Sequence, residues 1–329
     1  MMGVLIYGKL QVSGYKFPVT VNQKPQTRNR KLFFFGAMKI PLIKLHVAVF
    51  LWGFTGVLGR LITLNEGLLV WYRLVLTIIS LLVLMYVRGE LQRLSLKQTL
   101  QLFGIGVIVA LHWACFYGSI KYANVSIALT CLSAAGMFTA LLEPWVMHTR
   151  IQWLEVLLGM VGVAGIYLIF HFDPRYQTGI IIGTAATIFS VVFNLLNKRI
   201  IQQVSSKTML LYELCGGWLG VTVLMPFYLH LFPTEHLWPS LGDWGWLLLL
   251  CWFCTVLAMD LSLQSLRKLS AFTQSLTLNL EPVYGIILAF AVYHENKYLS
   301  SSFYIGFALI FLSVALQTFR IIKPKKESF

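Results

Sequence analysis

The feature that most constrains this chain is a series of apolar stretches, each close to twenty residues long and nearly free of charge, that recurs from about residue 42 to the C-terminus. At 1.5 Å per residue, a helix of this length crosses a hydrocarbon core of about 30 Å. The stretches lack the alternation of membrane β-strands, and backbone groups in lipid must be hydrogen-bonded internally. We therefore predict an all-α integral membrane protein.

Ten transmembrane helices are expected, arranged as two five-helix repeats that cover residues 38–173 and 174–322. The predicted spans are 42–63, 67–87, 99–119, 124–147 and 153–172 in the first repeat, and 178–197, 208–231, 244–266, 270–293 and 302–321 in the second. A basic tail follows at 323–329.

The composition agrees with a membrane protein and argues against other classes. Apolar residues make up 58% of the 329 residues and charged residues only 12%. The net charge of +14 comes from basic residues between the apolar spans, so it indicates topology and not nucleic-acid binding. The expected partners are the lipid bilayer and a small-molecule solute, and a homodimer is left open.

The five cysteines all fall inside predicted spans, where they are expected to fill space: Cys115, Cys131, Cys215, Cys251 and Cys254. Cys251 and Cys254 form a CxxC pair, but no second pair and no histidine lies near them in sequence. We expect no disulfide, metal site or cofactor.

Residues 1–37 contain six basic residues, two prolines and no sustained apolar run, so they are predicted to be a flexible basic tail. Met38 then opens a short basic flank that leads straight into the first span, as in many bacterial membrane proteins. One hypothesis is that Met38 is the natural start of translation.

The lysines and arginines predict how the chain crosses the membrane. Twenty-one of the 26 lie in loops and tails on one side, whereas only Arg60, Lys121, Arg175 and Lys297 lie on the other. The positive-inside rule then places both termini in the cytoplasm. The expected location is the bacterial inner membrane, with multiple crossings.

The two halves of the chain show weak similarity to each other. A shift of 146 residues aligns GSIKYANVSIA, from Gly118, with QSLRKLSAFTQ, from Gln264. Each repeat holds five spans, an odd number, so the second copy is expected to be inverted relative to the first. Inverted repeats are typical of transporters that work by alternating access around a site near the midplane.

The first half contains FLWGFTGVLGRL (50–61) and WYRLVL (71–76), and the second half contains LEPVYGIILAFAVYHE (280–295). With these motifs, the chain resembles the EamA-like family of the drug/metabolite transporter superfamily over about residues 40–320. The resemblance implies a ten-helix secondary transporter, with efflux the favoured direction. Three positions depart from the family pattern: Gly136 stands in place of a proline, Thr149 in place of a glutamate, and His294 in place of a glycine.

Ionisable residues inside the spans are the first candidates for the solute path, because a charge at mid-bilayer costs about 2.5 to 3.5 kcal/mol. Glu281 leads them, since it lies mid-span before Pro282, whose missing N–H predicts a kink or hinge. Asp260 and Arg73 follow, and Glu143 and Glu213 rank lower because they lie near span ends. For each, a buried structural partner is the alternative to solute binding or coupling.

Aromatic and amide side chains are the second group of candidates. Aromatic faces could line a cavity and stack on a solute, or simply pack between helices; these are Trp52, Trp71, Tyr72, His112, Trp113 and Tyr117. Asn194, Gln274 and Asn279 add hydrogen-bonding groups that could orient a solute or join helices.

Three functions remain open from the sequence. A secondary transporter of a small metabolite, amino acid or drug-like solute is favoured. The alternatives are a membrane-embedded enzyme that acts on lipid-linked substrates and a scaffold or regulatory protein. We expect no catalytic residues, because HExxH, G-x-S-x-G and phosphate-loop motifs are missing from the sequence, and all loops are short for a scaffold.

Overall fold

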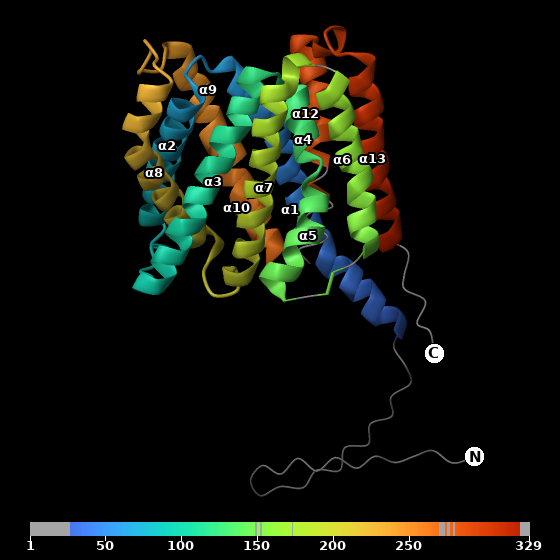
Figure 1. Ribbon diagram of the computed structural model, residues 1–329. Coiled ribbons are helices and arrows are strands. Elements are labelled where there is room, and N and C mark those ends of the chain that lie inside the picture. Colours follow the sequence, from blue (N-terminus) through green and yellow to red (C-terminus); the bar gives the residue numbers. More distant parts are fainter. Residues whose placement is uncertain are drawn as a thin grey trace, which may run out of the picture. The chain divides into compact units, whose positions relative to one another are not determined.

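The computed structural model describes residues 27–148, 150–151, 153–172, 174–269, 274, 277–278 and 280–322. In this part of the chain every regular element is helical (Figure 1). The first half contains α1 (Thr27–Leu61), α2 (Glu66–Val87), α3 (Leu96–Tyr122), α4 (Val125–Leu132), α5 (Ala135–Met147) and α6 (Trp153–Phe172). The second contains α7 (Gln177–Ile200), α8 (Ser206–Leu231), α9 (Leu241–Cys251), α10 (Ala258–Leu266), α12 (Leu280–Tyr293) and α13 (Ser301–Ile322).

Seven helical stretches among the described residues are long and apolar enough to cross a membrane. Three shorter apolar helices, Val156–Ile169, Leu280–Tyr293 and Ser301–Ser313, fall in the fifth, ninth and tenth predicted spans. The all-helical membrane class is therefore confirmed, whereas ten crossings stay a prediction. The structure places residues 27–37 in α1, and the rest of the predicted N-terminal tail lies outside the described residues.

Among the described residues, two of the predicted spans contain interruptions. The fourth divides into α4 and α5 at Ser133 and Ala134, with no proline at the break. The eighth is continuous from α9 to α10 but passes through a π-helical segment, Trp252–Leu257. In the π-helical segment the Cys254 carbonyl accepts a hydrogen bond from Trp52 of α1, whereas the Ser133 and Ala134 N–H groups stay hydrogen-bonded within the fourth span.

Several helices begin where the sequence supplies a capping side chain. The Asn65 side chain accepts a hydrogen bond from the Leu68 N–H (2.9 Å), and Asn124 does the same for Ile127 (2.8 Å). Helix α9 starts with a capping box between Ser240 and Asp243. These caps fix the helix ends that border the short loops.

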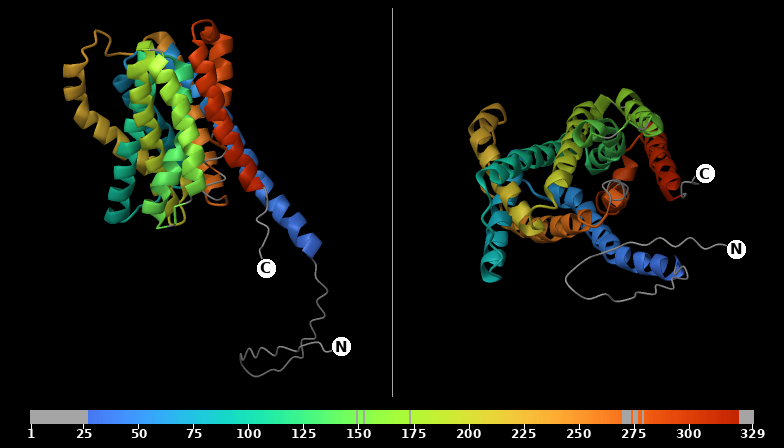
Figure 2. Two further views of the ribbon diagram at one scale, coloured as in Figure 1. Left: turned by 45° about the vertical axis from the view of Figure 1, so that its right-hand side comes forward. Right: turned by 90° about the horizontal axis from the view of Figure 1, so that it is seen from below.

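The helices that follow α1 run side by side, and glycine allows the closest of them to touch (Figures 1 and 2). Helix α3 packs against both α7 and α8, and a Cβ placed on Gly106 of α3 would lie 1.7 Å from the Glu213 carbonyl oxygen of α8. Helices α6 and α13 meet at Gly165 and Gly306 in the same way. Such small-residue contacts are typical of helix packing in membranes.

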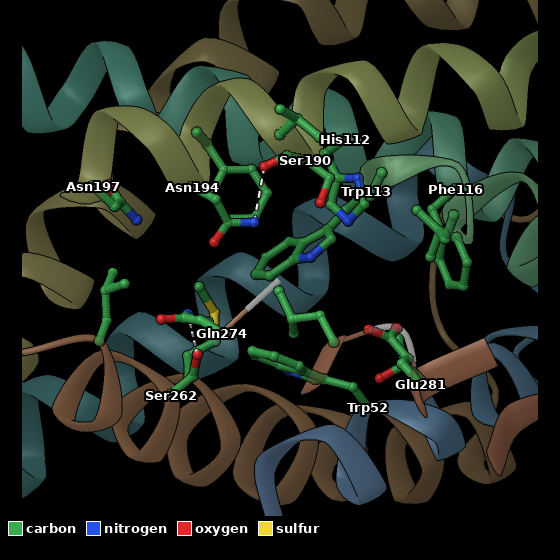
Figure 3. A pocket seen from close by; sticks show the side chains of 18 of the residues that line it. Trp52, His112, Trp113, Phe116, Ser190, Asn194, Asn197, Ser262, Gln274 and Glu281 are labelled. Carbon is green, nitrogen blue, oxygen red and sulfur yellow. Dashed lines mark hydrogen bonds between the residues drawn. The ribbon is translucent and has the colours of Figure 1, made fainter. Parts of the chain in front are cut away.

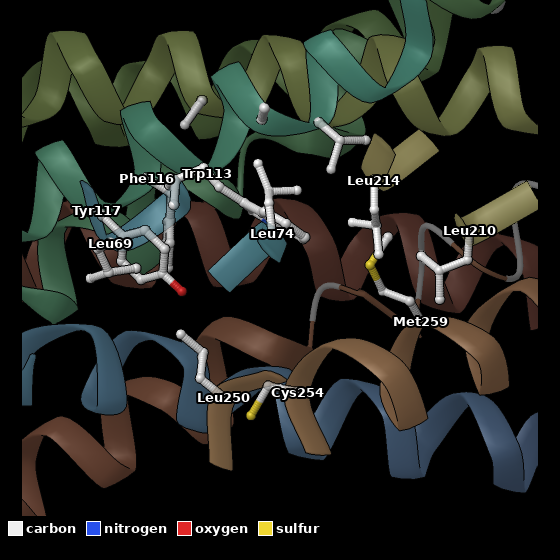
Figure 4. Close-up of a cluster of buried hydrophobic side chains, with 14 of the residues drawn as sticks. Leu69, Leu74, Trp113, Phe116, Tyr117, Leu210, Leu214, Leu250, Cys254 and Met259 are labelled. Carbon is white, nitrogen blue, oxygen red and sulfur yellow. The ribbon is translucent and has the colours of Figure 1, made fainter. Parts of the chain in front are cut away.

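The main hydrophobic core lies among α2, α3, α8, α9 and α10, and includes Leu69, Leu74, Trp113, Leu214 and Leu250 (Figure 4). Large apolar side chains are also common on the outside, where Val83 and Val223 are 59% and 78% exposed. An apolar exterior of this kind suits a protein whose surroundings are lipid.

Candidate functional site

A cavity of about 120 Å³ lies among the helices and is lined by residues of both halves of the chain (Figure 3). The first half contributes side chains from α1 to α5, and the second contributes side chains from α7, α10, α12 and the segment before α12. The cavity therefore lies where the two predicted repeats meet.

Eight of the residues singled out from the sequence line this cavity: Trp52, Arg73, His112, Trp113, Asn194, Gln274, Glu281 and Pro282. Tyr117 is not among the lining residues, but its hydroxyl is hydrogen-bonded to Arg73, which is. Trp71, Tyr72 and Asp260 do not line the cavity either. Asn279 falls outside the described residues. The role of the lining residues in solute binding stays a prediction.

Arg73 is fully buried, with only 1% of its surface exposed, and neutral groups hold it in place. Its Nε donates to Thr255 Oγ1 (2.9 Å) and its Nη1 donates to the Tyr117 hydroxyl (2.7 Å). The guanidinium carbon lies 3.7 Å from the centre of the Trp113 ring, a cation–π arrangement. No described residue forms an ion pair with Arg73, so its Nη2 hydrogens are available to a ligand.

Glu281 supplies the acidic group of the same cavity. It is half-buried in α12, directly before Pro282, and no described side chain is hydrogen-bonded to its carboxylate. Figure 3 shows its carboxylate on the cavity wall near Trp52. The cavity thus contains one cationic and one acidic side chain, neither neutralised by a direct ion pair with the described residues.

Aromatic rings form part of the lining of the same cavity. Trp52 is oriented by a hydrogen bond from its Nε1 to the Cys254 carbonyl (3.0 Å), which belongs to the π-helical segment. His112 stacks on Phe116, with ring centres 6.2 Å apart, and its Nδ1 lies 2.8 Å from the Ala186 carbonyl oxygen. The rings are therefore fixed surfaces on which an apolar or aromatic group can rest.

Neutral polar groups complete the lining. Gln274 donates from Nε2 to Ser262 Oγ (3.1 Å), while its buried Oε1 has no hydrogen-bond partner among the described residues. Asn194 donates from Nδ2 to the Ser190 carbonyl (2.9 Å), which leaves its amide oxygen available. Such acceptors can orient the N–H or O–H groups of a solute.

Comparison with known proteins decides the family. The model of the EamA-like transporter family matches residues 39–171 and again residues 177–319, so two copies of it cover most of the chain. The chain belongs to the EamA-like transporter family.

Other similarities agree with this assignment. An uncharacterized transporter of Haemophilus influenzae (strain ATCC 51907 / DSM 11121 / KW20 / Rd) is 26% identical over 166 residues, which cover 46% of the chain and 53% of the relative. The match thus spans about half the length of that curated relative. A protein of known crystal structure shares the fold, with a TM-score of 0.60 and 17% identity over 86% of this chain and 99% of that one.

The predicted candidates outside the cavity of this EamA-like transporter have other partners. Asp260 accepts hydrogen bonds from Ser206 (2.6 Å) and Gln264 (2.8 Å). Trp71 donates to the Thr222 hydroxyl (2.9 Å). Tyr72 donates to the Leu237 carbonyl (3.1 Å), and its ring packs against the ring of Trp244. All three therefore connect helices or loops.

One polar network at the end of the EamA-like fold was not anticipated from the sequence. Glu295 is 3% exposed, is paired with Arg60, and accepts hydrogen bonds from the Ser126 N–H (2.9 Å) and hydroxyl (2.6 Å) at the start of α4. It also accepts from the Val125 N–H (3.2 Å). Glu295 thereby joins α1, α4 and the end of α12. The sequence signal is the glutamate that closes LEPVYGIILAFAVYHE.

Proposed function

We propose that this transporter is a secondary carrier that moves a small zwitterionic, amphipathic solute, such as an amino acid, by alternating access. The observation that carries the proposal is the pairing of Arg73 and Glu281 in one cavity lined by both halves. A carboxylate suits the planar guanidinium of Arg73, and an ammonium group suits the carboxylate of Glu281.

The remaining lining supports an amphipathic solute. Trp52, Trp113 and Phe116 offer apolar faces, while Asn194 and Gln274 offer hydrogen-bonding groups beside them. Ligand sites of this composition bind an apolar body through rings and fix its orientation through a few polar groups.

Alternating access is supported by the way that corresponding helices pack. By their order in the two predicted repeats, α8 is the counterpart of α2, and α13 is the counterpart of α6. In the structure each of these helices is in contact with its counterpart. Helix α3 packs against α8, as its counterpart α9 packs against α2. We infer that the repeats are related by a pseudo-two-fold axis and inverted in the membrane, so that they can exchange inward-open and outward-open arrangements.

The Arg60–Glu295 network is proposed to close the outer end of the solute path. It joins α1, α4 and α12, three helices that also line the cavity. This assignment places both termini in the cytoplasm, as the loop charges predict, and puts the chain in the inner membrane. Export is proposed through the family resemblance, and a homodimer stays a prediction.

The proposed function is tested in proteoliposomes with radiolabelled phenylalanine, leucine, lysine and glutamate. We expect flux of the zwitterions phenylalanine and leucine above that of lysine and glutamate. Glu281→Gln removes the charge that holds the ammonium group, and hydrogen bonds to charged groups contribute about 1.5–3 kcal/mol, so it should reduce zwitterion uptake about tenfold or more.

Glu90→Gln is the matched control. Glu90 is an acid outside the cavity that pairs with Lys207 (2.7 Å), so its replacement should leave flux unchanged. Equal loss in both variants, or zwitterion flux that does not respond to Glu281→Gln, would contradict the proposed site.

A further inference from the structure

A second buried acid lies next to the cavity and plays no part in the proposed solute contacts. Glu213 is in the third turn of α8 and is completely buried. Its Oε2 accepts a hydrogen bond from Asn197 Nδ2 at 3.4 Å, a long contact. Asn197 is itself a cavity-lining residue, so the Glu213 carboxyl is separated from the cavity by this one side chain.

Two of the three side-chain oxygens of this pair have no donor among the described residues. Glu213 Oε1 and Asn197 Oδ1 are both buried, and neither has a hydrogen-bond partner among the described residues. A buried polar group left without a partner costs about 1–3 kcal/mol, and more when the group is charged. One proton on Glu213 satisfies both atoms, because Oε1–H then donates to Oδ1 while Nδ2 donates to Oε2. The result is the cyclic pair that a carboxylic acid forms with an amide.

No basic group of the described residues forms an ion pair with Glu213. The charged and titratable groups on the surrounding helices have other partners. Among the basic groups, Lys198 donates to the Leu266 and Leu269 carbonyls, Arg73 donates to Thr255 and Tyr117, and Lys207 is paired with Glu90. Asp260 accepts from Ser206 and Gln264, and His112 is bonded to the Ala186 carbonyl. No described residue forms an ion pair with Glu213. An unpaired buried carboxylate is strongly disfavoured, so the neutral acid fits this site better.

Helix α3 prevents water from reaching the carboxyl through the α8 interface. The backbones of α3 and α8 touch at Gly106, Gly216 and Gly217, where an added Cβ would meet backbone atoms of the other helix at 1.7, 2.2 and 2.7 Å. On the cavity side, Asn197 gives Glu213 a polar contact with a residue that lines the cavity.

We propose that Glu213 and Asn197 form a proton-binding site in the wall of the cavity. In this conformation the site holds a proton, and its release and return couple solute movement to proton movement. The coupling rests on the proposed function, whereas the bound proton does not. When α7 moves away from α8, the O–H bond breaks, water in the cavity takes the proton, and the carboxylate remains. The proton must return before the helices can close again, so transport should slow when protons are scarce.

Infrared spectroscopy of the purified protein in lipid tests the bound proton without any solute. At neutral pH the wild type should show a carbonyl stretch of a protonated carboxyl that disappears in Glu213→Gln. Glutamine keeps the hydrogen-bonded pair, since its amide donates to Asn197 Oδ1 as the acid does, so the variant is expected to fold.

Asn197→Leu should keep the band but shift it to higher wavenumber, because the Glu213 carbonyl loses its donor. A Glu213→Gln spectrum that differs from wild type only in the carboxylate bands would overturn the proposal.

Flux of radiolabelled phenylalanine and leucine at different pH values tests the coupling. Wild-type flux should fall about tenfold as the pH is raised through the range in which the acid loses its proton, whereas Glu213→Gln should stay nearly flat because its amide cannot ionise. Equal pH dependence in both proteins would reject coupling through Glu213. If neither amino acid moves at all, the proposed substrate class fails, and the infrared result still decides whether the proton is there.

Discussion

Arg73 shows how a buried charge can be held firmly and still remain available to a ligand. Two of its N–H groups donate to Thr255 and Tyr117, and its flat face rests on Trp113. None of these neutral partners cancels its charge. The rarity of ionisable residues in apolar spans was enough to select Arg73 and Glu281 from the sequence. Thr255 and Asn197 could not be selected in this way, because neutral polar side chains are common in membrane helices.

Thr255→Val tests whether the orientation of Arg73 matters for the solute. Removing this hydroxyl leaves the buried Nε–H without an acceptor, so Arg73 should lose its fixed position. A hydrogen bond of this kind contributes about 1 kcal/mol or more, which corresponds to an increase of about fivefold in the half-saturating phenylalanine concentration. The maximal rate should change little, because Thr255 does not line the cavity.

Thr222→Val is the control for this experiment, since Thr222 bonds to Trp71, which does not line the cavity. Identical half-saturation in wild type and Thr255→Val would show that the hydroxyl does not position Arg73.

At the scale of the element, one irregular helical segment holds two side chains of the site. The π-helical segment Trp252–Leu257 offers the Cys254 carbonyl to Trp52 and the Thr255 hydroxyl to Arg73. The break between α4 and α5 occurs without proline. Hydropathy predicted where these spans lie, but it averages over about twenty residues. It therefore contains no information on a single displaced hydrogen bond, which depends on contacts with other helices.

Close packing of α3 on α8 gives a prediction with a control on the same helix. Gly106→Ala places a Cβ against the Glu213 carbonyl oxygen, at a distance that forces the helices apart. Overpacking of this kind costs about 1–3 kcal/mol, so the midpoint of thermal unfolding in detergent should fall by several degrees. Gly104→Ala has open space around the new Cβ and should leave the midpoint unchanged or raise it. Equal midpoints for the two variants would show that the interface can relax around Gly106.

At the scale of the whole molecule, two halves matched by the same family model both line one cavity. The family model matches each half separately, and residues of both halves line the cavity. The odd number of predicted spans in each half predicts an inverted second copy. This orientation followed from loop charges in the sequence, whereas the contacts of α2 with α8 and of α6 with α13 could be seen only in the structure.

Labelling of single cysteines from each face of the membrane tests this inversion most directly. Leu91 lies between α2 and α3, and Leu237 lies in the corresponding loop between α8 and α9; the two residues are 48% and 47% exposed. Each is replaced by cysteine in a variant without the five native cysteines and treated with a membrane-impermeant maleimide. In inside-out vesicles Leu91→Cys should react and Leu237→Cys should not, and right-side-out vesicles should give the reverse. Reaction of both cysteines from the same face would contradict inverted repeats and, with them, alternating access through this cavity.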